Sequence, residues 1–176
     1  MESSFASLAS ATITVFIALI FARAAVHKLT EFTEFTGFVN DYRLLGERLV
    51  RPASMAIVAA EIAVVALQLV PGGQLPGLAI AAGMLVLYAV AMAFNIRRGR
   101  THIECGCGGA VQPLSWALVV RNAVLVLLAG LAMLTGPLNL DIGGTITAIA
   151  CGLATWVVFL LAEQILANSS LARLTR

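Results

Sequence analysis

The sequence has few charged residues. Asp, Glu, Lys and Arg make up only 11% of its 176 residues, whereas a soluble domain carries about 25%. Hydrophobic residues make up 60%, so a folded chain of this length could not cover its surface with polar groups. The net charge of +2 does not indicate nucleic-acid binding. These values exclude a water-soluble domain and indicate a membrane protein.

The sequence also has no internal repeat and no low-complexity segment. Residues 1–4 carry no positive charge, so we expect the first apolar stretch to be a retained span rather than a cleaved signal. The length leaves no room for a second domain, so we expect one transmembrane domain over residues 1–176.

Five apolar stretches are long enough to cross a bilayer. A helix needs about 20 mainly apolar residues, because the hydrocarbon core is about 30 Å thick. Open sheet edges do not occur in lipid, so the spans should be helices. The predicted fold class is all-α: a polytopic membrane bundle of about five transmembrane helices plus one interfacial amphipathic helix. The expected spans are 7–26, 53–70, 76–95, 114–135 and 143–167.

The interfacial helix is predicted between the first two spans, within residues 27–51. Its apolar side chains recur at helical spacing, with acidic and basic residues between them, which is typical of a helix lying in the interface. The segment is too charged to be a sixth span. The apolar positions are Phe32, Phe35, Phe38, Val39, Tyr42 and Leu45.

Two of the three cysteines lie one residue apart in a glycine-rich loop. Cys105 and Cys107 flank Gly106, and Gly108 and Gly109 follow. The cysteine Cα atoms would be about 5.5–7 Å apart, within the range of a disulfide. So small a ring would be strained and easily reduced, which suits exchange better than a structural role. In this interpretation the protein is a thiol–disulfide oxidoreductase.

Other interpretations of the loop stay open. His102, Cys105 and Cys107, with a further ligand such as His27, would suit zinc or copper(I), although the spacing is not a standard zinc motif. Alternatively, the cysteines only fill a tight turn. His27 and His102 are predicted at the same membrane face as the cysteines, where they could activate a thiol or act only as interfacial side chains. Cys151 is expected on the order of 20 Å from the level of Cys105, as a small hydrophobic residue.

Four ionisable residues fall inside the expected spans. Charges in the hydrocarbon normally face the bundle interior and are paired. Counted along the helices, Glu61 lies about 12 Å and Arg121 about 10 Å from the same face, which predicts a pair. Arg23 and Glu163 lie within about 6 Å of that face and would pair or snorkel. Together with Asn122, these residues would form a polar floor beneath the cysteine loop, or only hold the bundle together.

Basic residues are distributed unequally between the two faces. Segments 27–52 and 96–113 and the C-terminus share one face with nine Lys and Arg residues, and the opposite face has none. The positive-inside rule therefore predicts that the N-terminus is outside and that the C-terminus and the cysteine loop are cytoplasmic.

The sequence from Asn95 to Gly130, NIRRGRTHIECGCGGAVQPLSWALVVRNAVLVLLAG, resembles the MauE family of methylamine utilisation membrane proteins, within the wider DoxX-like group. The similarity covers essentially the whole chain and includes the segment AVHKL at 25–29, Glu61 and the Arg121-Asn122 pair. The wider group often carries phenylalanine where this chain has Gly108, and the glycine form is similar to the methylamine-cluster members.

The resemblance implies a role in maturation at the cell inner membrane. MauE proteins are linked to production of the small β subunit of methylamine dehydrogenase, a periplasmic quinoprotein with a tryptophan tryptophylquinone cofactor and many disulfides. Their usual partner is MauD, a thioredoxin-like protein. We therefore expect a redox-associated maturation factor that acts in disulfide formation, processing or export of that subunit.

Two alternatives to this role stay open: a soft-metal or small-molecule carrier, and a non-catalytic assembly chaperone. The sequence identifies no cofactor with certainty. A quinone stays open, although no motif indicates a quinone site. The periplasmic substrate conflicts with a cytoplasmic loop. Access to the thiols from the opposite side, or transfer of electrons across the membrane with Cys151 as a stage, would reconcile the two.

Overall fold

The computed structural model describes residues 2–103, 106, 113–135 and 140–174. In these ranges the chain forms six α helices: α1 (Glu2–Thr30), α2 (Phe32–Asp41), α3 (Glu47–Leu69), α4 (Gln74–Arg97), α5 (Trp116–Met133) and α6 (Ile142–Leu174). Five of them, all except α2, are long and apolar enough to cross a membrane. This confirms the predicted all-α fold class.

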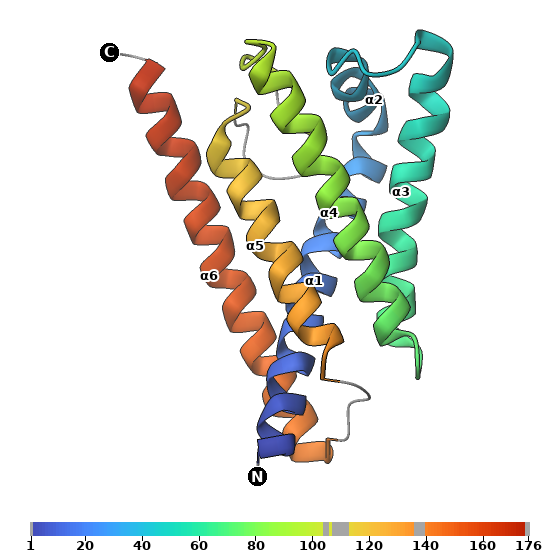
Figure 1. Ribbon diagram of the computed structural model, residues 1–176, viewed down its shortest axis with the longest axis vertical. Helices are drawn as coiled ribbons and strands as arrows, with labels where there is room; N and C mark the ends of the chain where they lie inside the picture. The colour runs from blue at the N-terminus through green and yellow to red at the C-terminus, as the bar shows by residue number, and fades with distance from the viewer. Residues whose placement is uncertain (1, 104–105, 107–112, 136–139, 175–176) are drawn as a thin grey trace.

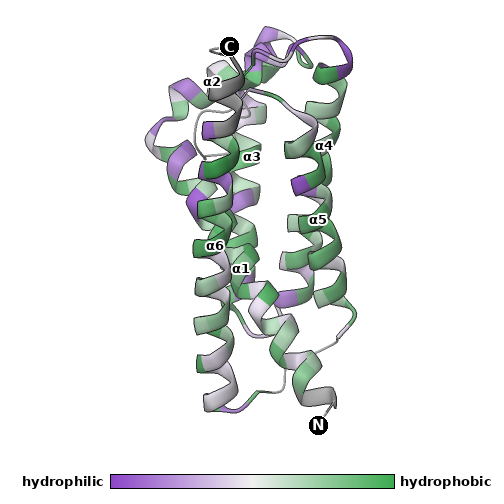
Figure 2. Cartoon of the chain, turned by 90° about the vertical axis from the view of Figure 1, so that its left-hand side faces the viewer, coloured by the Kyte–Doolittle hydropathy of each residue, from purple (hydrophilic) through white to green (hydrophobic). Residues whose placement is uncertain are grey.

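The long helices run side by side along the longest axis of the molecule (Figure 1). The N-terminus lies at one end, and α2, the last turn of α4 and the end of α6 lie at the other. Hydrophilic residues gather at the end that holds α2, whereas the long helices are mainly hydrophobic along their length (Figure 2). The predicted alternation of the connections between two ends is therefore confirmed.

The first helix is longer than predicted. Its span was expected to end at residue 26, but α1 continues to Thr30 and includes His27 and Lys28 in its last turn. The amphipathic segment then forms the ten-residue helix α2, which packs against α1 and α3. Phe35 is its buried residue. The chain thus places Lys28 inside the bundle rather than in a connection.

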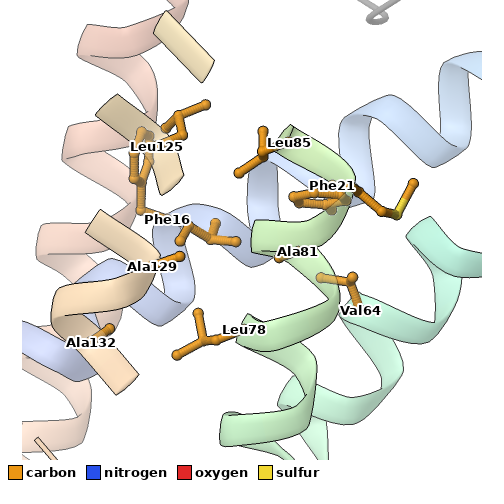
Figure 3. Close-up of a cluster of buried hydrophobic side chains, with 11 residues drawn as sticks. Phe16, Phe21, Val64, Leu78, Ala81, Leu85, Leu125, Ala129 and Ala132 are labelled. Carbon is orange, nitrogen blue, oxygen red and sulfur yellow. The ribbon is translucent and has the colours of Figure 1, made fainter. Parts of the chain in front are cut away.

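The helix α1 occupies the centre of the bundle and packs against α3, α4, α5 and α6. Figure 3 shows the hydrophobic core where Phe16 and Phe21 of α1 meet side chains of α3, α4 and α5. Small residues allow these helices to approach closely. At Gly152 of α6, an added Cβ would lie 2.6 Å from Cγ1 of Val15, so α6 rests directly on α1.

The outer surface of the bundle is apolar. Leu127, Val158 and Ile165 have 67%, 65% and 68% of their surface exposed, as expected for side chains in contact with lipid. At the N-terminal end, hydrogen bonds join three helices. Nε2 of Gln74 donates to the hydroxyls of Ser10 and Thr14, each at 3.1 Å, and the Ser10 hydroxyl donates to the carbonyl of Ala132.

Candidate functional site

A buried ion pair joins α1 to α3 near the α2 end. The helical period places Lys28 on the same inward face as Ile17, Phe21 and Ala24. Lys28 is only 1% exposed, and its Nζ donates to Oε1 of Glu61 at 2.7 Å. Glu61 has no exposed surface. Each charge therefore depends on the other, because neither reaches water.

The pair extends to α4 and α2 through aromatic residues. The hydroxyl of Tyr88 donates to the same Oε1 of Glu61 at 2.8 Å. The Lys28 Nζ lies 5.2 Å from the ring centroid of Phe35 and 5.7 Å from that of Tyr88, which is within the range of cation–π attraction. Four helices thus surround one ammonium group.

A second charged cluster joins α1, α5 and α6. Nη1 of Arg23 donates to Oε2 of Glu163 at 2.9 Å, and Nη1 of Arg121 donates to Oε1 of the same carboxylate. The side chains of Arg121 and Glu163 are mostly buried, whereas that of Arg23 is 37% exposed. Of the two alternatives for Arg23 and Glu163, pairing and snorkelling, the structure shows the pair, and Arg121 completes the cluster.

The predicted pair between Glu61 and Arg121 is wrong. Counted in residues along the helices, Glu61 and Arg121 lie at similar depth from the same membrane face. Depth alone, however, does not specify which helices are neighbours. The helix α3 packs against α1 and α4, and α5 packs against α1, α4 and not α3 in the described part of the chain. Each residue therefore finds its partner elsewhere: Glu61 with Lys28, and Arg121 with Glu163.

The two clusters border one small cavity of about 40 Å³, enough for about one water molecule. Three buried polar atoms of residues lining it have no hydrogen-bond partner in the described structure: Oε2 of Glu61, Nε of Arg121 and Nε1 of Trp156. A water there would have one acceptor and two donors to bind. All five residues of the predicted polar floor line this cavity, namely Arg23, Glu61, Arg121, Asn122 and Glu163.

A larger apolar cavity of about 430 Å³ lies beneath α2. Its walls come from α2, α3, α4 and the connection between α2 and α3. Lys28 and Tyr88 line both cavities, so they form the boundary between the polar and the apolar space. Gly106, the residue between the two loop cysteines, also lines the apolar cavity.

Gly106 adopts a left-handed backbone conformation, with φ at 66°. A Cβ built there would lie 3.4 Å from Cβ of Phe38 on α2. A side chain would therefore be strained by both the backbone and the contact, which explains glycine at this position. Cys105 and Cys107 themselves, like Gly108 and Gly109, lie outside the described residues.

The two histidines have different surroundings. Nε2 of His27 lies 3.3 Å from Oε2 of Glu31, one turn further along the chain, and the His27 side chain is 38% exposed. His102 is exposed. The next residue, Ile103, packs at the cluster of Met92, Leu114 and Leu118, and its carbonyl accepts a hydrogen bond from the amide of Leu114. The contacts of either histidine with the loop cysteines lie outside the described residues.

Cys151 lies on the outer surface of α6, where it is exposed and is a free cysteine within the described part of the chain. Burial of this side chain, which is the usual state of a cysteine in an apolar helix, is therefore not what the structure shows. The reason is that α6 packs against α1 and turns its remaining faces outward.

Sequence reasoning missed Lys28 and Tyr88 as members of the site. The charge of Lys28 predicts a position in the connecting segment 27–52, beyond the end of the first span. The spacing of Ile17, Phe21, Ala24 and Lys28, at four, three and four residues, was the available signal. The sequence signal for Tyr88 is weaker: its hydroxyl group lies in the middle of an otherwise apolar span.

The fold and the site define a multi-pass helical membrane protein whose intramembrane charges are paired in the bundle interior. A family model described as "Methylamine utilisation protein MauE" matches residues 6–135. The chain therefore belongs to the MauE family of methylamine utilisation proteins, which confirms the resemblance.

Individual relatives agree with this assignment. The methylamine utilization protein MauE of Paracoccus denitrificans is 38% identical over 164 residues, covering 90% of this chain and 87% of that protein. The MauE protein of Methylorubrum extorquens is 40% identical over 140 residues, covering 74% and 75%. That of Paracoccus versutus is 42% identical over 116 residues, covering 65% and 62%. No solved structure matches the chain.

Proposed function

We propose that the protein is a membrane redox factor that matures the small β subunit of methylamine dehydrogenase. Cys105 and Cys107 would exchange disulfides with a thioredoxin-like partner of the MauD type. The observation that carries this proposal is the position of Gly106, which lies in a left-handed turn against Phe38 at the wall of the apolar cavity. The thiols are its covalent neighbours, in a protein of the methylamine utilisation family.

The exchange proceeds in two steps. A thiolate of the partner attacks Cys105 of the Cys105–Cys107 disulfide, and Cys107 leaves as a thiolate that takes up a proton. The second partner thiolate then attacks the partner sulfur of the mixed disulfide and releases Cys105. The partner gains a disulfide, and the membrane protein holds two thiols. Strain in the small ring favours this direction.

We further propose that the cysteine loop faces the cytoplasm, because the segments that meet at the α2 end carry many basic residues, namely Arg43, Arg48, Arg51, Arg97, Arg98 and Arg100. A subunit destined for the periplasm is made in the cytoplasm. This orientation therefore assigns the exchange to the stage before export.

A trapping experiment tests the proposed exchange. In Cys107→Ser, the Cys105 thiolate can still attack the disulfide of the oxidised partner, which is the reverse of the second step, but no Cys107 thiolate can then displace the partner. A mixed disulfide with the thioredoxin-like partner should therefore accumulate and disappear on reduction. Cys151→Ser is the matched control and should trap nothing. Absence of any mixed disulfide would contradict the proposal. Zinc or copper(I) that copurifies with the wild type and is lost from Cys105→Ser would indicate a carrier instead.

A further inference from the structure

Three buried polar atoms from three different helices lack a hydrogen-bond partner around the small polar cavity. In the described part of the chain they are Oε2 of Glu61 on α3, Nε of Arg121 on α5 and Nε1 of Trp156 on α6, and all three residues line the cavity. Buried polar groups are nearly always hydrogen-bonded, because an unpartnered group loses its bonds to water on folding and gains none in return. Three such atoms around one cavity therefore indicate a ligand that serves all of them.

The other polar residues that line this cavity already hold partners. Each of them takes part in a side-chain hydrogen bond: Arg23, Lys28, Tyr88, Asn122 and Glu163. The Glu61 carboxylate shows the contrast within one group. Its Oε1 accepts from Lys28 at 2.7 Å and from Tyr88 at 2.8 Å, whereas its Oε2 accepts from no described residue. The unmet bonding capacity at the cavity is thus one acceptor and two donors.

This set of atoms selects a small neutral ligand that both donates and accepts hydrogen bonds. An anion would accept from Arg121 and Trp156, but the Glu61 carboxylate would repel it. A cation would find two N–H donors and would be repelled by the Arg121 guanidinium. Water suits all three atoms, because a buried water typically makes about three hydrogen bonds. The cavity volume of about 40 Å³ exceeds the roughly 10–15 Å³ that one water requires.

We propose that the cavity binds a water molecule that joins the two charged clusters into a single network. The water accepts from Nε of Arg121 and from Nε1 of Trp156, and it donates to Oε2 of Glu61. The site does not depend on the proposed thiol exchange, because every residue that forms it lies in a spanning helix.

The water links helices that do not pack against one another. In the described part of the chain, α3, α5 and α6 each pack against α1, and α6 packs against no other helix. The Arg121–Glu163 pair already connects α6 to α5. Through the water, Trp156 of α6 also reaches Glu61 of α3, so α6 and α3 should be energetically coupled although their backbones are not neighbours.

The indole N–H signal of Trp156 tests the water directly. Full-length protein in nanodiscs, with labelled nitrogen in its two tryptophan side chains, should give two indole resonances. The resonance that Trp156→Phe removes should show a dipolar cross-peak to a water proton, and Trp116→Phe should leave that cross-peak unchanged. Absence of the cross-peak would overturn the water site. So would a shift of the Trp156 resonance when chloride is replaced by nitrate, because it would identify an anion instead.

A double-mutant cycle tests the coupling of α3 to α6. Trp156→Phe removes one donor, and Glu61→Gln puts an amide N–H in place of the acceptor when its remaining oxygen stays with Lys28 and Tyr88. Because both changes disrupt the same water, the double variant should lose less melting temperature than the sum of the two separate losses.

Trp116→Phe is the matched control for this cycle. Trp116 is 50% exposed and is not among the described residues that line the cavity, so its loss should add to that of Glu61→Gln. Additive losses for Trp156→Phe and Glu61→Gln would overturn the link between α3 and α6. If Glu61→Gln does not fold, the indole cross-peak alone decides whether the water is bound.

Discussion

At the scale of single residues, the Lys28–Glu61 pair is expected to dominate stability. Removing one partner leaves a buried charge uncompensated, which costs about 3–5 kcal/mol, whereas removing both costs less. Lys28→Met and Glu61→Gln should each lower the melting temperature and the amount of folded protein in the membrane. The double variant should recover much of both.

A thermal melt in detergent measures this coupling, with Glu47→Gln as a control at an exposed position of the same helix. If the effects of Lys28→Met and Glu61→Gln simply add, the two residues are not partners.

Gly106 supports a second prediction at this scale. Gly106→Ala places a methyl group against Phe38 and forces alanine into a left-handed conformation, at a cost of about 1–2 kcal/mol. The yield of trapped partner, measured in the Cys107→Ser background, should fall. Gly99→Ala has the same kind of backbone strain, with φ at 73°, but nothing within 4 Å of its Cβ. Equal loss of trapping in both variants would show that the Phe38 contact is unimportant.

At the scale of helices, α2 is expected to form the cover of the apolar cavity. Phe35 is its buried anchor and lies against Lys28. Phe35→Ala removes a large buried side chain, which costs about 3 kcal/mol, so α2 should detach from α1 and α3. Amide hydrogen exchange should then rise over Phe32–Asp41 while α4 and α5 stay protected.

Thr33→Ala, at an exposed position of α2, is the control and should leave exchange unchanged. Unchanged protection of α2 in Phe35→Ala would contradict the anchoring role of Phe35.

The helices themselves could be predicted from the sequence, but their neighbours could not. Length and apolarity identify each span because the bilayer fixes how long a helix must be. The period of Phe32, Phe35 and Phe38 likewise identified α2. Which helix faces which depends on the packing of side chains from distant segments. Depth along the helices therefore leaves both pairing and snorkelling open for Arg23 and Glu163, and it wrongly pairs Glu61 with Arg121. The cavity that Tyr88 and Gly106 share depends on the same packing.

At the scale of the whole molecule, the distribution of basic residues predicts the orientation. A phosphatase fused after Arg176 should be inactive, because the C-terminus would be cytoplasmic. A membrane-impermeant maleimide should fail to label Cys105 in intact spheroplasts and should label it after lysis. Rapid labelling in intact spheroplasts would reverse the orientation and move the exchange to the periplasmic side.

The most direct test of the central claim is the amount of mature methylamine dehydrogenase β subunit in cells that depend on a variant of this protein. If disulfide exchange at the loop matures the subunit, the Cys105→Ser, Cys107→Ser double variant should abolish its accumulation while the membrane protein itself stays at its normal level. Cys151→Ser should leave the subunit unchanged. A normal amount of disulfide-bonded β subunit in the double variant would contradict the claim.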